Sequence, residues 1–198
     1  ADPAFKSSRR TKWTPARSDQ DFIVRSRLTG LKPGATYHYR ALVGRDRTSF
    51  RMGPARQFRT LPGAQANREV RFCVGSCMIY ARFIGGTSAN KLPLTTTDED
   101  RRLGYPAFAA MNQLQPDFFV GTGDIVYYDW PRTKTRPAAK TLPELRRKWH
   151  EQFRFPRLVE FFGRTPAYWS KDDHDFRYDD ADRTGARLPD PTTGIDVF

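Results

Sequence analysis

The feature that most constrains the fold is a β-α-β pattern in the middle of the chain. Residues 70–74 (Val-Arg-Phe-Cys-Val) and 117–120 (Asp-Phe-Phe-Val) are short, largely apolar runs of the length expected for strands. Residues 105–115 between them have helical spacing, with one predicted face formed by Ala107, Met111 and Leu114. Two strands joined in this way by a helix predict a parallel α/β layer.

A second helical region supports the same class. Residues 142–162 place Leu145, Trp149 and Phe153 on one stripe, and Pro156 should interrupt the helix because proline lacks a backbone N–H. The apolar run at 166–169 then predicts another strand. We therefore expect an α/β (α+β) fold for this part of the chain.

The first third of the chain has a different, all-β pattern. Residues 24–28, 37–43 and 55–61 alternate like strands, and Leu-Lys-Pro-Gly at 31–34 supplies turn chemistry. The stretch 28–40, with its Pro-Gly and the Tyr-His-Tyr-Arg that follows, resembles the last strands of fibronectin type III-like domains.

The change of pattern predicts where the domains divide. We expect a partial fibronectin III-like β domain at 1–61, a linker at 62–68 that includes Pro-Gly, and an α/β domain at 69–198.

Composition restricts the classes of partner. Hydrophobic residues make up 38% of the chain, enough for a packed core, and the net charge of +12 is compatible with an anionic partner, although an ordinary basic surface is the simpler interpretation. The basic residues are scattered and not gathered in one arm, so nucleic acid is not excluded but is not indicated. No apolar run approaches the ~20 residues that span a bilayer.

Polar residues follow each of the three strands of the α/β region. The segments are Gly75-Ser76-Cys77, the glycine-rich run from 121 to 129, and the acidic run from 172 to 176. Ligands of open α/β sheets bind beyond the carboxyl ends of the strands. These three loops are therefore the candidate site.

The residue types in the loops favour a metal. Asp124 offers two hard oxygens, and Tyr127 can become a ligand beside a strong Lewis acid such as ferric iron. Asp172, Asp173 and Asp175 around His174 would repel one another unless a cation or solvent compensates them. The alternatives are a glycine-rich turn with ordinary packed aromatics, an acidic turn countered by neighbouring Lys171 and Arg177, and a buried, inert Cys77.

Together these segments resemble the PhoD-like alkaline phosphatases and phosphodiesterases of the calcineurin-like metallophosphoesterase superfamily. The motifs are Ser-Cys, Gly-x-x-Gly-Asp-x-x-Tyr and Asp-Asp-His-Asp, in this order behind a fibronectin-like segment. The resemblance implies a β-sandwich flanked by helices and a site with Fe3+ and Ca2+, other divalent cations being possible. It further implies a secreted, periplasmic or cell-envelope location.

The resemblance also implies roles for five residues. Cys77 and Tyr127 would bind the iron, and Asp124 would bridge iron to the second cation. Asp173 would bind that second cation, and His174 would be the catalytic residue that faces the scissile phosphate. The implied reaction is hydrolysis of a phosphate mono- or diester by a metal-bound hydroxide.

Two departures from the family pattern matter. Ser170 and Lys171 separate Trp169 from the acidic pair, where the family has Trp directly before Asp-Asp-His. The superfamily also takes further Asp and His ligands from a carboxyl-terminal half, and residues 69–198 match only the amino-terminal half. We therefore expect the site to be incomplete in this chain alone, with a second polypeptide segment completing it.

Two other functions stay open. A purple acid phosphatase also joins a fibronectin-like domain to a Gly-Asp-x-x-Tyr loop, but its first motif is Asp-x-His, where this chain has Gly75-Ser76-Cys77. A non-catalytic module that binds polyanions would use the basic surface without a metal.

Overall fold

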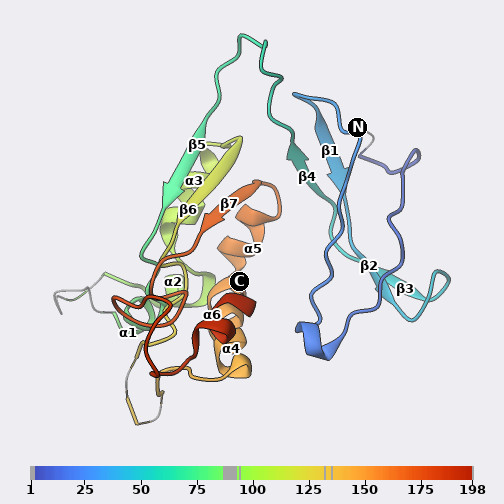
Figure 1. The fold of residues 1–198 in the computed structure, drawn as a ribbon. Coiled ribbons are helices and arrows are strands. Elements are labelled where there is room, and N and C mark those ends of the chain that lie inside the picture. Colours follow the sequence, from blue (N-terminus) through green and yellow to red (C-terminus); the bar gives the residue numbers. More distant parts are fainter. Residues whose placement is uncertain (1–2, 87–92, 94, 132, 135, 198) are drawn as a thin grey trace.

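The computed structural model describes residues 3–86, 93, 95–131, 133–134 and 136–197. It is a mixed α/β structure with three small sheets (Figure 1). This confirms the expected α/β class. Within the described residues, no helix is long and apolar enough to cross a membrane.

The amino-terminal third forms two antiparallel pairs of strands. β1 (Thr36–Tyr39) pairs with β4 (Arg56–Arg59), and β2 (Leu42–Gly44) pairs with β3 (Phe50–Met52). A single 3-10 turn, η1 (Ser18–Gln20), precedes them.

Two strand predictions for this region need correction. The strand expected at 37–43 is divided between β1 and β2, and residues 24–28 form no strand because they have no partner for a hydrogen-bonded ladder and leave Val24 and Leu28 exposed. The fibronectin-like character and the division at 61 and 68 stay predictions.

The central sheet is parallel and has the order β5-β6-β7. β5 (Phe72–Gly75) pairs with β6 (Phe118–Thr122), which pairs with β7 (Ala167–Ser170). The carboxyl ends of the strands therefore lie at one edge, where the chain continues into the loops of the candidate site (Figure 1).

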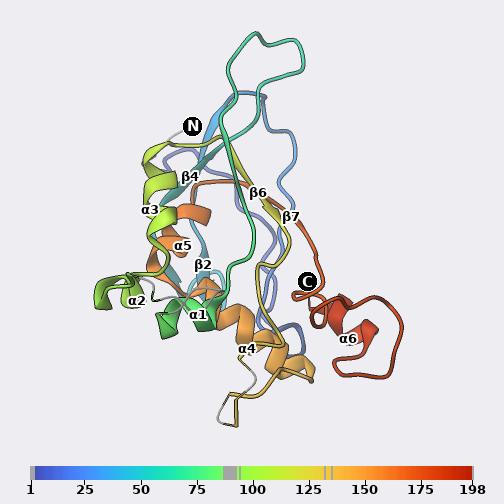
Figure 2. The same cartoon turned by 90° about the vertical axis from the view of Figure 1, so that its left-hand side faces the viewer.

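Helices cover one face of this sheet. α3 (Pro106–Gln113) and α5 (Pro156–Phe162) pack against each other on that face, and α4 (Leu142–Phe153) extends the layer (Figure 2). Three short helices complete the described elements: α1 (Tyr80–Gly85), α2 (Asp98–Leu103) and α6 (Pro191–Asp196).

The core lies between the helices and the inner face of the sheet. Phe119, in the middle of β6, is fully buried and contacts the rings of Phe108, Phe161 and Phe162. The stripe predicted on 142–162 is confirmed, since Leu145 is buried and Trp149 and Phe153 pack against the core.

The predicted face of α3 was right only for Met111, which packs against the core. Phe108 is its buried residue, whereas Ala107 and Leu114 are exposed. The helix begins at Pro106 and turns its one large aromatic ring inward, because a phenylalanine buries far more apolar area than an alanine.

The outer face of the sheet is apolar and exposed. Phe72, Val74 and Tyr168 are each 55% accessible, and Phe72 stacks on Phe118 with ring centroids 5.1 Å apart. The two-layered sandwich expected from the family resemblance is therefore not present among the described residues. Parallel sheets normally have both faces covered, so this face is unusual.

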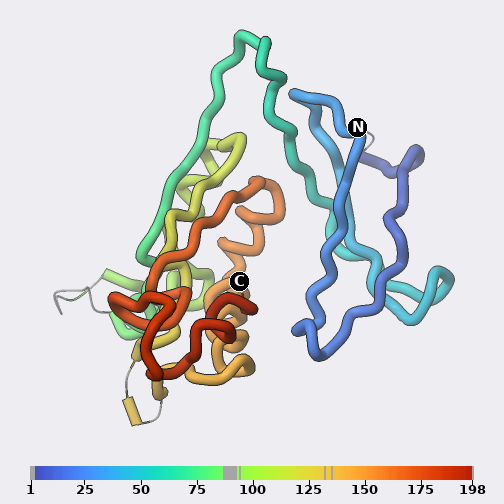
Figure 3. The backbone as a smooth tube through the Cα atoms, viewed as in Figure 1, coloured from blue at the N-terminus to red at the C-terminus, as the bar shows by residue number. Residues whose placement is uncertain are grey.

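The amino-terminal strands contact the helical side of the α/β region. The Tyr39 hydroxyl donates a hydrogen bond to the Gly163 carbonyl at 2.8 Å, and His150 Nε2 lies 2.7 Å from a carboxylate oxygen of Asp21. Figure 3 shows the segment between β4 and β5 as a long excursion that projects beyond both regions.

Candidate metal centre

The three loops after β5, β6 and β7 are joined by backbone hydrogen bonds. The Met78 N–H donates to the Asp124 carbonyl at 2.9 Å, and the Tyr128 N–H donates to the His174 carbonyl at 3.2 Å. Gly123 has a φ of +95°, and a Cβ there would lie 2.4 Å from the Cβ of Asp172. Only glycine allows the second and third loops to approach this closely.

Asp124 lies at the centre of the site. One of its carboxylate oxygens, Oδ2, accepts a hydrogen bond from the Tyr127 hydroxyl at 2.7 Å and lies 3.7 Å from the Cys77 sulfur. The other oxygen, Oδ1, is buried and has no hydrogen-bond partner. A buried acceptor without a partner is costly in a folded protein, so this oxygen is available to bind a cation.

The electrostatics of Asp124 also call for a positive charge. Burial raises the pKa of the Asp124 carboxyl, and the hydrogen bond from Tyr127 offsets only part of that rise. Burial and the carboxylate of Asp124 likewise raise the pKa of the Tyr127 phenol. Without a cation, both groups therefore hold their protons more tightly than they would in water.

The backbone is strained where the ligands are predicted. Cys77 has a φ of +56° and Asp124 a φ of +55°, in the left-handed region that non-glycine residues seldom occupy. Such strain is often found at functional sites, where surrounding contacts hold it in place.

Asp173 and His174 approach Asp124 from the third loop. One donor atom from each of these three residues lies within 4.8 Å of the others, a spacing that could hold a metal ion. Asp173 Oδ1 accepts the His174 backbone N–H at 2.8 Å, and its Oδ2 accepts the Asp180 N–H. These bonds orient the carboxylate, and each oxygen keeps a lone pair for a cation.

His174 is held by a carboxylate on its other side. Its Nδ1 lies 2.7 Å from Asp129 Oδ1, and the imidazole lies against the Tyr127 ring with centroids 4.2 Å apart. Both His174 and Asp129 are buried. Because a carboxylate can only accept, Nδ1 carries the proton toward Asp129, and Nε2, which lies 3.5 Å from Asp179 Oδ1, is the ring atom that faces the exposed side of the site.

The sequence prediction gave no role to Asp129. It lies five residues after Asp124 in the same glycine-rich loop, and only the folded loop shows that it turns back toward His174.

Asp175 is a second buried carboxylate that was predicted only as part of an acidic run. It accepts the Ile125 N–H at 2.9 Å and the Asp172 N–H at 2.7 Å, so one side chain links the second loop to the third. Burial raises the pKa of Asp175 to about 6. The two neighbouring acids therefore have different contacts. Asp175 accepts hydrogen bonds from the backbone of two loops, whereas Asp173 belongs to the cluster with Asp124 and His174.

The donor set fits a metal site. The other four residues predicted from the sequence gather around Asp124: Cys77 and Tyr127 through direct contacts, Asp173 and His174 through the 4.8 Å cluster. A thiol and a phenol suit ferric iron, and carboxylate oxygens suit calcium. The described residues nevertheless offer fewer donors than two such ions require, since calcium alone takes 6–8 oxygens.

Comparison with known proteins supports the fold. No protein-family model matches the sequence, and no curated protein matches it. Among solved structures, one described as PhoD matches 91% of this chain with a TM-score of 0.63 and 21% sequence identity, and the match covers 32% of that longer chain. The chain therefore has a PhoD-like mixed α/β fold and spans about a third of that structure's length.

Proposed function

We propose that this chain carries the metal-binding half of a phosphoester hydrolase. The observation that carries the proposal is the buried, unpartnered Oδ1 of Asp124 within a group of carboxylate, thiol, phenol and imidazole side chains. These groups come from the ends of three parallel strands, where α/β proteins bind ligands. The PhoD-like fold and the sequence motifs support the same reaction class.

The proposed ligands divide by chemistry. Cys77 and Tyr127 would hold Fe3+, Asp173 would hold a second cation such as Ca2+, and Asp124 would bridge the two. When bound, such a pair offsets the charge of the phosphate oxygens and acidifies a water molecule. Tyr127 donates its hydroxyl proton to Asp124 in the present structure, so iron binding would release that proton.

His174 would act on the leaving oxygen of the substrate. Asp129 orients the ring through Nδ1 and stabilises the protonated imidazole, which leaves Nε2–H as the donor. Asp129 is thus a positioning residue, and His174 is the proposed catalytic residue.

Two substitutions separate these roles. Asp124→Asn should remove metal and hydrolysis together, because the bridging charge is lost. His174→Ala should retain the metal while hydrolysis of p-nitrophenyl phosphate and bis(p-nitrophenyl) phosphate falls about 100-fold or more, as expected for loss of a general acid. Elemental analysis and initial rates measure both effects, and unchanged hydrolysis in both variants would refute the proposal.

The iron assignment has its own optical test. Ferric iron bound by the Tyr127 phenolate should give a visible charge-transfer band, which should weaken and shift in iron-loaded Tyr127→Phe, where only the Cys77 thiolate would remain as a charge-transfer ligand. A colourless iron-loaded protein would contradict the assignment of Tyr127 as a ligand.

We also propose that a second polypeptide segment completes the site. The described donors are too few for two cations, and the outer face of the β5-β6-β7 sheet, with Phe72, Val74 and Tyr168, is apolar and exposed. Intact mass and elemental analysis of the isolated enzyme test this. An active enzyme of 22.9 kDa with both metals at full occupancy would contradict it.

The two other functions remain distinguishable. A purple acid phosphatase would not use Cys77, so loss of iron in Cys77→Ser argues against that class. Salt-sensitive binding of phosphate polymers without metal-dependent hydrolysis would favour the polyanion-binding module. A location outside the cytoplasm stays a prediction from the family resemblance.

A further inference from the structure

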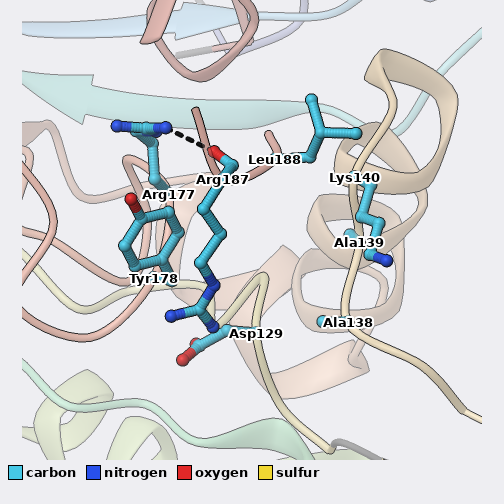
Figure 4. A pocket seen from close by; sticks show the side chains of 8 residues that line it. All are labelled: Asp129, Ala138, Ala139, Lys140, Arg177, Tyr178, Arg187 and Leu188. Carbon is cyan, nitrogen blue, oxygen red and sulfur yellow. Dashed lines mark hydrogen bonds between the residues drawn. The ribbon is translucent and has the colours of Figure 1, made fainter. Parts of the chain in front are cut away.

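A cavity of about 340 Å³ lies beside the His174–Asp129 pair. This volume is within the range of small-molecule sites, ~300–1,000 Å³. Its walls come from the loop before α4 and from the loop between β7 and α6 (Figure 4). The lining residues are Asp129, Ala138, Ala139, Lys140, Arg177, Tyr178, Arg187 and Leu188.

The charges that line the cavity are mostly positive. Lys140, Arg177 and Arg187 contribute three cations, against the single carboxylate of Asp129. That carboxylate is already bonded to His174. Among the described residues, no carboxylate lies within 4.0 Å of any of the three cationic groups. The cavity therefore favours an anion.

The positive wall is built rigidly. Arg177 is fully buried, and its guanidinium donates only to backbone carbonyls of the loop that forms this wall. Those acceptors are the carbonyls of Asp182, Thr184, Gly185, Arg187 and Pro189. Carbonyl groups stabilise the guanidinium without cancelling its full charge, so the wall stays electropositive.

The more exposed arginine is held in place as well. The Arg187 guanidinium lies 3.9 Å from the centroid of the Tyr178 ring, and in Figure 4 its side chain extends toward the Asp129 end of the cavity. A guanidinium held over an aromatic ring loses less freedom when it binds an anion.

The remaining lining is apolar. Ala138, Ala139 and Leu188 offer no hydrogen-bonding side chains and can contact a carbon linker. Asp129 belongs both to this cavity and to the pair that orients His174. An anion bound here would therefore sit next to the proposed catalytic residue, His174.

We propose that this cavity binds a second phosphate group of the substrate. The inference rests on the proposed function and narrows its substrate class: organic phosphoesters that carry two or more phosphate groups separated by a short carbon linker. One phosphate occupies the candidate metal centre, and the next occupies the cavity lined by Lys140, Arg177 and Arg187.

The cavity can be tested without metals or catalysis. In EDTA, the double variant Lys140→Ala/Arg187→Ala should bind inorganic phosphate about tenfold more weakly or worse, because two charge-assisted contacts are lost. The matched control, Lys134→Ala/Arg183→Ala, removes the same charges from the same two loops outside the cavity. Calorimetric titration at low salt measures binding, and circular dichroism checks the fold.

The outcomes of this binding test are separate from those for the reaction. Equal affinities of wild type and cavity variant, or equal weakening in the control, would overturn the inference even if the protein hydrolyses phosphoesters. Weakening confined to the cavity variant supports it, even if no hydrolysis is found and the proposed function fails.

Hydrolysis gives a second measurement on the metal-loaded enzyme. Wild type should have a lower KM for propane-1,3-diol bisphosphate than for propyl phosphate, and Lys140→Ala/Arg187→Ala should reduce that preference about tenfold with little change in kcat. Equal KM values for the two substrates in wild type would contradict a second phosphate subsite.

Discussion

Replacing Asp175 with asparagine should change how stability depends on pH. Asp175 is fully buried, accepts the N–H groups of Ile125 and Asp172, and has its pKa raised from 3.8 to about 6 by burial. The folded protein therefore binds this proton more tightly than the unfolded chain does. Between pH 3.8 and 6 the folded state holds more protons, so stability falls as the pH rises.

The size of the effect follows from the shift. One pKa unit corresponds to about 1.4 kcal/mol, so ionised Asp175 costs the folded state about 3 kcal/mol at pH 7. Asparagine removes that cost but presents an NH2 group to one of the two backbone donors, which costs about 1–3 kcal/mol. Asp175→Asn should thus be less stable than wild type at pH 4 and similar to it at pH 7.

Urea unfolding of the metal-free proteins, followed by circular dichroism from pH 4 to 7, measures this difference. Asp182→Asn is a control in which the pH dependence of stability should change in the opposite direction. Hydrogen bonds from Thr184 lower the pKa of the exposed Asp182 carboxyl, so its contribution is present above the unfolded pKa and lost as the pH falls. Parallel stability profiles for wild type and Asp175→Asn would refute the reasoning.

Three further substitutions test other parts of the structure. Asp129→Asn should retain metal but lower kcat about 100-fold, because Nδ1 of His174 loses the acceptor that fixes its tautomer; unaltered kcat would contradict this. Arg177→Lys should lose several carbonyl contacts and destabilise the protein by about 2–4 kcal/mol, with faster proteolysis at residues 182–189; wild-type proteolysis would exclude the loop-organising role. Val74→Lys on the exposed sheet face should change the free energy of unfolding by less than ~0.5 kcal/mol, whereas Phe119→Ala in the core should lower it by ~3–5 kcal/mol. A loss above ~1 kcal/mol for Val74→Lys would show that this face is covered in solution.

The elements that the sequence predicted well are those whose side chains pack against one another locally. β6 and the stripe of α4 combine apolar spacing with clear ends, so Phe119 and Leu145 were placed correctly. Residues 24–28 have equally good alternation, but a strand also needs a partner, and pairing is not encoded in spacing. The exposure of the outer sheet face was not predicted either. An apolar residue such as Val74 predicts a buried position, and the sequence does not say which segment would cover it.

The residues of the candidate site also fall into a group that the sequence predicted and a group that it did not. Cys77, Asp124, Tyr127, Asp173 and His174 were predicted from motifs, and the structure brings the other four close to Asp124; their roles as ligands or catalytic groups stay predictions. The partners that orient them were not found, because a carboxylate that accepts a backbone N–H looks the same in sequence as one that faces solvent. Burial in the folded loops is what distinguishes them.

The candidate metal centre is assembled without the exposed sheet face. Buried Tyr127 contacts its central carboxylate, buried Asp129 contacts its histidine, buried Asp175 links the second loop to the third, and the Tyr128 hydroxyl is held by Trp149 of α4. These contacts come from the loops and the helical layer, and none uses a side chain of the outer sheet face. The geometry around Asp124 should therefore form in this chain alone, so its metal affinity measures the contribution of these ligands. Any tighter binding by a longer polypeptide would then report the ligands that the added segment supplies.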